Sequence, residues 1–221
     1  MKSDRLFGIP YAICDIDPTS YNKRELIRDI KSNYRKNPNR NKGPIGRPDD
    51  NIHHAYGDWD NPKYIKSNYA PLIQIYEKII PNCLNKCGLR DNFKFNFNLV
   101  NYSCMSEGSY MSFHHHATCD FVGLHYIQFD LETHIPTEYA NEHPFSHYQA
   151  QLRPNIRELV GDDVNSSMYF EYWRLPVKED SFHIVPGFLR HHVPRQPKCK
   201  KLRMVLIINI DIDCWSIGTT K

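Results

Sequence analysis

The sequence contains no uninterrupted apolar run of 18 residues among its 221 positions, so we expect no transmembrane helix. The opening stretch, MKSDRLFGIPYAICDID, lacks the extended apolar core of a secretory signal peptide. Together these two absences predict a cytoplasmic protein that does not insert into a membrane.

An even set of regularly spaced cysteines is absent as well. The chain has seven cysteines at irregular spacings, which predicts reduced thiols rather than a disulfide framework. Cys83 and Cys87 are one helical turn apart, but no second pair of ligands follows at the spacing of a zinc site. We therefore interpret these two cysteines as ordinary helix residues.

The net charge of +3 is small but unevenly distributed. Residues 21–48 contain nine Lys or Arg and two acidic residues, a local balance of +7, so the rest of the chain carries −4. A basic segment can attract nucleic acid or another polyanion. No aromatic stacking motif interleaves these charges, which favours a solvated helix face followed by a basic loop.

The chain reads as one domain with two parts of different character. In residues 1–91, a short strand is expected over 6–14, a helix after Ser20, and a second helix over 69–87. Pro81 predicts a break or kink in the second helix, and Gly88 is a stop signal. We expect an α+β protein that is mainly β, because residues 92–216 contain a succession of short strand-like segments.

These strand-like segments are rich in β-branched and aromatic residues. They cover residues 93–103, 109–116, 120–130, 166–177, 181–188 and 201–212. A polar insertion over 132–166 interrupts them. The insertion and the loop over 36–68 are expected to flank a site and to carry its specificity.

The chemistry is expected in two histidine clusters, His114–His116 and His191–His192. Side chains two apart on a strand share a face, so His114 and His116 can face inward while His115 points outward. Imidazole is a common ligand of iron, copper and zinc. Asp120 follows at H-x-H-x3-D, and a turn at residues 117–119 would be needed to bring it to the same ion. If the segment runs straight, Asp120 lies about 13 Å from His116.

The stretches GSYMSFHHHATCDFVGLHYIQF, SFHIVPGFLRHHVPRQ and KLRMVLIIN resemble the core of 2-oxoglutarate-dependent Fe(II) oxygenases. The resemblance is to the type found in marine phages and bacteria, and it covers about residues 95–212. It rests on residues that agree in order, spacing and type, namely His114, His116, Gly123, Tyr126, Pro186, His191, Val193, Arg203 and Asn209.

This resemblance implies a double-stranded β-helix core, of the jelly-roll or cupin-like type, with N-terminal helices packed on it. It implies Fe(II), 2-oxoglutarate and O2 as cofactors, and a hydroxylase that releases succinate and CO2. The sequence does not identify the primary substrate, which would be a small molecule or a protein. If the chain is viral, its location would be the cytoplasm of the host.

The resemblance also implies roles for individual residues. His191 would be the distal metal ligand, and Arg203 would pair with the distal carboxylate of 2-oxoglutarate, because its planar fork suits a carboxylate. Tyr126, Tyr102 and Asn209 would complete the cosubstrate site.

One departure leaves the metal ligands open. The wider superfamily has H-x-D before the distal histidine, whereas none of the three clustered histidines here has an acidic residue two positions later. The ligands are then two histidines with Asp120, His114–His116–His191 alone, or all four as in some cupins. A cupin-type metalloenzyme that needs no 2-oxoglutarate is therefore an alternative, as is a non-catalytic protein that binds metal or nucleic acid.

Overall fold

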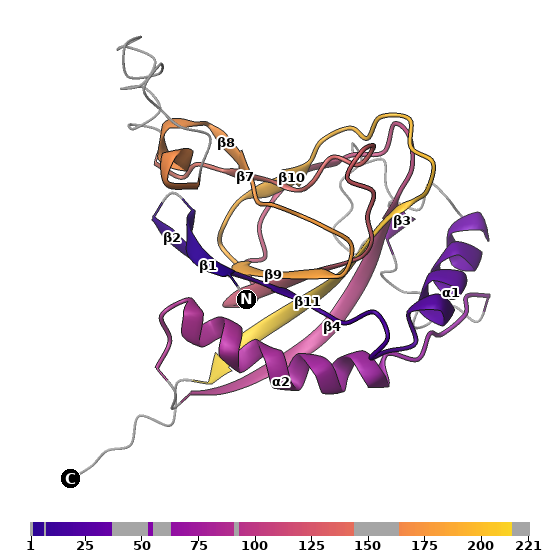
Figure 1. The fold of residues 1–221 in the computed structure, drawn as a ribbon, viewed down its shortest axis with the longest axis horizontal. Helices are drawn as coiled ribbons and strands as arrows, with labels where there is room; N and C mark the ends of the chain where they lie inside the picture. The colour runs from indigo at the N-terminus through magenta and orange to yellow at the C-terminus, as the bar shows by residue number, and fades with distance from the viewer. Residues whose placement is uncertain are drawn as a thin grey trace.

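The computed structural model describes residues 2–6, 8–36, 53–54, 63–90, 93–143 and 164–213. Within these ranges the protein is mainly β, with two antiparallel sheets and two α-helices (Figure 1). The expectation of a mainly β protein is therefore confirmed. No helix in this part of the chain is both long and apolar enough to span a bilayer.

The larger sheet has seven strands in the order β1-β2-β9-β6-β11-β4-β3, all joined antiparallel. The long strands β11 and β4 lie side by side toward the β3 edge of this sheet (Figure 1). The seven strands are β1 (Lys2–Leu6), β2 (Ile9–Asp15), β3 (His53–His54), β4 (Lys94–Met105), β6 (Phe121–Gln128), β9 (Ser181–Pro186) and β11 (Arg203–Asp213).

The smaller sheet has four strands in the order β5-β10-β7-β8. Its strands are β5 (Met111–His114), β7 (Glu138–Ala140), β8 (Tyr172–Arg174) and β10 (His191–Val193). Strands β7 and β10 lie above the larger sheet in Figure 1. A short 3-10 helix, η1 (Val164–Tyr169), precedes β8.

Both helices, α1 (Lys23–Lys36) and α2 (Ala70–Lys86), lie on the face of the larger sheet away from the smaller sheet (Figure 1). Their apolar residues, including Leu26 of α1 and Tyr76 of α2, pack with strand residues in one buried cluster. A break or a kink was expected at Pro81; helix α2 continues through this residue, so it does not break there, and it ends next to Gly88, whose φ is +99°.

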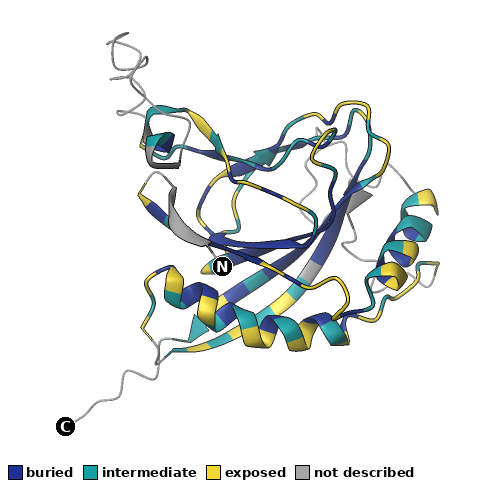
Figure 2. Ribbon diagram, viewed as in Figure 1, coloured by how far each residue is buried: buried dark blue, intermediate teal, exposed yellow. Residues whose placement is uncertain are grey.

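A second apolar cluster fills the space between the two sheets. Strand β11 shows the division by alternation, because Met204 and Leu206 belong to the helix-side cluster while Val205 and Ile207 belong to the cluster between the sheets. Burial is concentrated in these strands, whereas the helices are exposed along their outer sides (Figure 2). We call the space between the sheets the interior.

The structure corrects two sequence expectations. Strand β7 lies inside the segment expected to be an insertion, and the stretch expected to be one strand over 166–177 contains η1 and the short β8. The helix expected after Ser20 is present and begins at Lys23, and Ser20 lies in the turn before it, where its hydroxyl donates to the backbone oxygen of Asp17. Most of the loop over 36–68 lies outside the described residues.

Candidate metal centre

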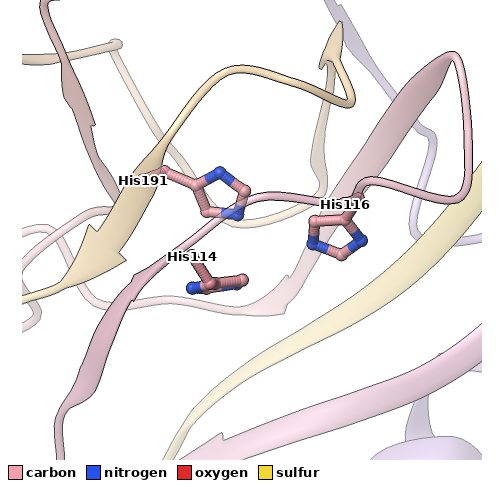
Figure 3. Close-up of side chains that lie close together, drawn as sticks. All are labelled: His114, His116 and His191. Atoms are coloured by element: carbon pink, nitrogen blue, oxygen red, sulfur yellow. The ribbon is translucent and has the colours of Figure 1, made fainter.

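Three histidines converge at one end of the interior. His114 ends β5 and is the register partner of His191, which begins β10, while His116 lies in the loop after β5. One ring nitrogen of each lies within 4.8 Å of the other two, and the rings face one another (Figure 3). Among the described residues this is the one group of three or more His, Cys, Asp or Glu with such spacing.

Hydrogen bonds fix the protonation pattern of all three rings. The Nδ1 atoms of His114 and His191 lie 2.9 and 2.8 Å from the backbone oxygens of Ser112 and Leu189. A carbonyl oxygen can only accept, so Nδ1 donates in both rings. Nε2 is then the nitrogen that each neutral imidazole offers to a metal, which is how oxygen acceptors orient ligand histidines in metal sites.

His116 is held by side-chain and backbone contacts. Its Nδ1 lies 3.2 Å from Oδ1 of Asn209 on β11, so the same proton pattern applies to this ring. Its backbone N–H donates to the oxygen of Gly187 at 2.8 Å. A Cβ on Gly187 would lie 2.2 Å from the backbone oxygen of Cys119 and 2.8 Å from that of His116, so glycine is required for this approach.

Asp120 does not join the three histidines. The sequence left open whether the chain turns at residues 117–119; a turn is present there, yet Asp120 is exposed and its Oδ2 accepts a 2.7 Å bond from the backbone N–H of Ile212. The turn directs this carboxylate toward the end of β11. Of the three ligand sets left open by the sequence, the geometry brings together His114, His116 and His191 alone.

The neighbouring histidines point elsewhere. His115 is exposed, and His192 is half-buried with its Nε2 2.7 Å from a carboxylate oxygen of Glu138. The alternation expected from the sequence therefore separates inward from outward histidines in both clusters. Strand β5 ends at His114, so His116 reaches the group from the following loop rather than from a strand.

Arg203 lies deeper in the interior, at the start of β11, with 1% of its surface exposed. One terminal nitrogen donates to Oγ1 of Thr137 at 3.0 Å, and the guanidinium lies over the Tyr126 ring at 5.3 Å. Burial lowers the pKa of Arg203 from its usual value. Within the described residues no carboxylate forms an ion pair with it, and its Nε has no hydrogen-bond partner.

The tyrosines expected in the cosubstrate site lie on opposite faces of the sheet. Tyr126 is in the interior, and its hydroxyl donates to the same Thr137 oxygen at 3.0 Å. Tyr102 packs in the helix-side cluster, because it is the register partner of Leu206. It does not share a face with Arg203.

Two interior residues were missed by the sequence reasoning. Thr137 joins Arg203 and Tyr126, and Tyr139 of β7 is fully buried with its ring 5.9 Å from that of His191. Both were hidden in the segment read as a polar insertion. The available signal for a strand was alternation, because Thr137 and Tyr139 stand on either side of the charged Glu138.

Comparison with known proteins gives structural neighbours but no sequence relatives. No family model and no curated protein matches the chain. A prolyl hydroxylase from Trichoplax adhaerens, in complex with a hypoxia inducible factor peptide fragment, is 10% identical with a TM-score of 0.51, over 91% of this chain and 83% of that one. The two chains share a fold.

Two further solved structures are similar at lower TM-scores. A viral collagen prolyl hydroxylase from Paramecium Bursaria Chlorella virus-1, in a 2OG complex, is 13% identical over 90% of this chain and 94% of that one, with a TM-score of 0.45. An oxidoreductase of the 2OG-Fe(II) oxygenase family from Burkholderia pseudomallei is 7% identical, with a TM-score of 0.43. That alignment covers 67% of this chain and spans 60% of the Burkholderia protein.

Proposed function

We propose that this protein is an Fe(II)/2-oxoglutarate-dependent dioxygenase that hydroxylates a substrate still to be identified. The observation that carries this proposal is a fully buried arginine without a carboxylate partner among the described residues, in the same interior as three converging histidines. A buried unpaired charge is costly, so such a group is retained where an anionic ligand completes it.

The proposed scaffold is a double-stranded β-helix made of the two sheets. The small sheet lies over one face of the large one, and the helices cover the other face (Figure 1). The fold shared with the Trichoplax prolyl hydroxylase supports this assignment. In such a scaffold the ends of several strands bring distant ligands together, as His114 and His191 do here.

The donor atoms fit a divalent transition metal. Neutral imidazoles suit iron, copper, nickel and zinc, and three of them within 4.8 Å of one another would occupy one face of an ion. A bound Fe(II) would supply the activation of O2 that couples decarboxylation of 2-oxoglutarate to hydroxylation, with release of succinate and CO2.

The protein's own residues would bind and orient the cosubstrate. Arg203 would donate to the distal carboxylate, while Thr137 and Tyr126 hold the guanidinium in place through the shared Thr137 oxygen and the aromatic face. The apolar residues of the interior, such as Val205 and Ile207, would exclude water from the reacting groups.

The charges of the site suit a dianion. Three neutral histidines leave both positive charges of a divalent metal uncompensated, and Arg203 adds a third. Asp120, the carboxylate nearest in sequence, is directed away from the group. A 2-oxo dicarboxylate would bring two negative charges, one at the metal end and one at the arginine end.

A direct test is anaerobic titration of the purified protein with Fe(II) and then 2-oxoglutarate, followed by visible absorption. We expect a weak visible band that saturates with the cosubstrate, and succinate release once oxygen is admitted. In Arg203→Lys, which keeps the charge but loses the planar fork, the band should require at least about tenfold more 2-oxoglutarate. A wild type that binds Fe(II) but shows neither the band nor succinate would overturn the proposal.

The all-histidine ligand set favours one second candidate, a cupin-type metalloenzyme without a cosubstrate. In that case the metal would bind to the same three histidines, but 2-oxoglutarate would not change the spectrum. The metal affinity of Arg203→Lys would then equal that of the wild type, and no turnover of 2-oxoglutarate would be measured with either protein.

A further inference from the structure

The hydroxyl group of Tyr139 is buried in the interior without a hydrogen-bond partner among the described residues. The side chain is 0% exposed, whereas the hydroxyl of Tyr126 in the same interior is bonded to Thr137. Leaving a buried hydroxyl without a partner costs free energy, and most buried polar groups in folded proteins are paired. An unpaired phenol therefore points to a partner outside the chain.

The position of Tyr139 lies between the two parts of the proposed site. Its register partner across the small sheet is His191, and its ring is 5.9 Å from the His191 ring. Thr137, which contacts Arg203, is two residues earlier. Two residues of strand span about 6.6 Å, so this segment reaches from the arginine end toward the metal end.

We propose that the hydroxyl of Tyr139 donates a hydrogen bond to the bound 2-oxo dicarboxylate between its contacts with Arg203 and the metal. This inference rests on the proposed function. The partner should offer acceptor atoms, because Nε of Arg203, a second buried atom on this side without a hydrogen-bond partner among the described residues, is a donor as well. These two donors match the oxygens of an anion.

The test is the variant Tyr139→Phe, which removes one oxygen and leaves the ring. The dissociation constant of 2-oxoglutarate is measured by anaerobic titration of the Fe(II) protein, and metal affinity is measured separately with Mn(II). We expect the cosubstrate constant to rise about tenfold and the metal constant to stay within about twofold, since a hydrogen bond to a charged acceptor has this magnitude.

Tyr76→Phe is the matched control, because its hydroxyl contacts His125 on the helix side of the sheet, at 2.8 Å. It should leave the cosubstrate constant unchanged. The melting temperature without ligand separates binding from a structural role, and we expect Tyr139→Phe to melt no lower than the wild type.

Three outcomes would overturn the inference. Unchanged 2-oxoglutarate binding in Tyr139→Phe would overturn it while leaving the proposed function intact. A lower melting temperature of the ligand-free variant would assign the hydroxyl a structural role instead. Failure of the wild type to bind 2-oxoglutarate at all would overturn both this inference and the proposed function.

Discussion

The buried polar groups on the two faces of the large sheet differ in how far they are paired within the chain. On the helix side, charged and polar groups are joined in one network: the hydroxyl of Tyr21 donates to Asp180 at 2.6 Å, and Lys23 pairs with both Asp180 and Glu179. The hydroxyl of Tyr76 bonds to His125 in the same region. Lys23, Glu179 and Asp180 are paired with one another in this network, and Nε2 of His125 is the buried atom there that has no hydrogen-bond partner among the described residues.

On the interior side the polar groups are incomplete. Arg203 has a single oxygen acceptor among the described residues, and the hydroxyl of Tyr139 has none. Three imidazoles face one another, and no carboxylate from the described part of the chain joins their group. The contrast suggests that the helix side contributes stability, whereas the interior gives up stability for the binding of a metal and an anion.

The largest expected effect comes from His191→Ala. Removing one of three ligands should weaken Fe(II) or Mn(II) binding by at least about 100-fold, because two imidazoles hold a divalent metal far less firmly than three. Isothermal titration calorimetry measures the affinity, and circular dichroism should show that the metal-free variant is still folded.

His192→Ala is the matched control, since this neighbour bonds to Glu138 outside the group. Its metal affinity should equal that of the wild type. Equal losses in the two variants would show that the site is not where the geometry places it.

Arg203→Met should separate binding from stability. We expect 2-oxoglutarate to bind about 100-fold more weakly, which is about 2.7 kcal/mol, because the carboxylate loses its charged partner. The ligand-free variant should be at least as stable as the wild type in urea, since a buried charge that has no ion pair among the described residues is replaced by an apolar side chain. Strong destabilisation of the ligand-free variant would instead assign Arg203 to the structural groups.

Gly187→Ala should affect stability and binding together, because the added methyl group meets backbone rather than a movable side chain. We expect a loss of about 1–3 kcal/mol in unfolding free energy and weaker metal binding, as the loop bearing His116 is displaced. The exposed neighbour Phe188 offers the control, and Phe188→Ala should change neither. Normal metal affinity in Gly187→Ala would mean that the loop adapts without moving His116.

Local patterns in the sequence were enough to anticipate several parts of the structure. Alternation along the strands separates inward from outward histidines, and Gly88 marks the end of α2. These features depend on neighbours in sequence. The positions of Asp120 and Tyr102 depend on the register between strands, which local sequence patterns do not give. In the structure Asp120 points to β11, and Tyr102 points to the helices.

The same limit applies to Asn209 and Tyr139. Asn209 was expected beside the cosubstrate, and β11 places its side-chain oxygen against His116, where it orients this proposed metal ligand. Tyr139 lies in a strand of three residues, too short for its alternation to stand out from a loop. Strand β7 is positioned by its pairing with β10, which is distant from it in the sequence.

A pH dependence of stability probes the two faces through one buried histidine on each. Burial lowers the pKa of both His125, on the helix side, and His183, beside Tyr126, to about 3. The unfolded chain takes up these protons near pH 6.5 while the folded chain does not, so stability is present above pH 6.5 and is lost progressively as the pH falls toward 3. Each histidine can contribute up to about 1.4 kcal/mol per pH unit within this window. Urea unfolding at pH 7 and pH 5 should show this loss, and His125→Gln should remove about half of the part due to the two histidines. If His125→Gln and His183→Gln both keep the full wild-type dependence, the loss of stability arises from other groups.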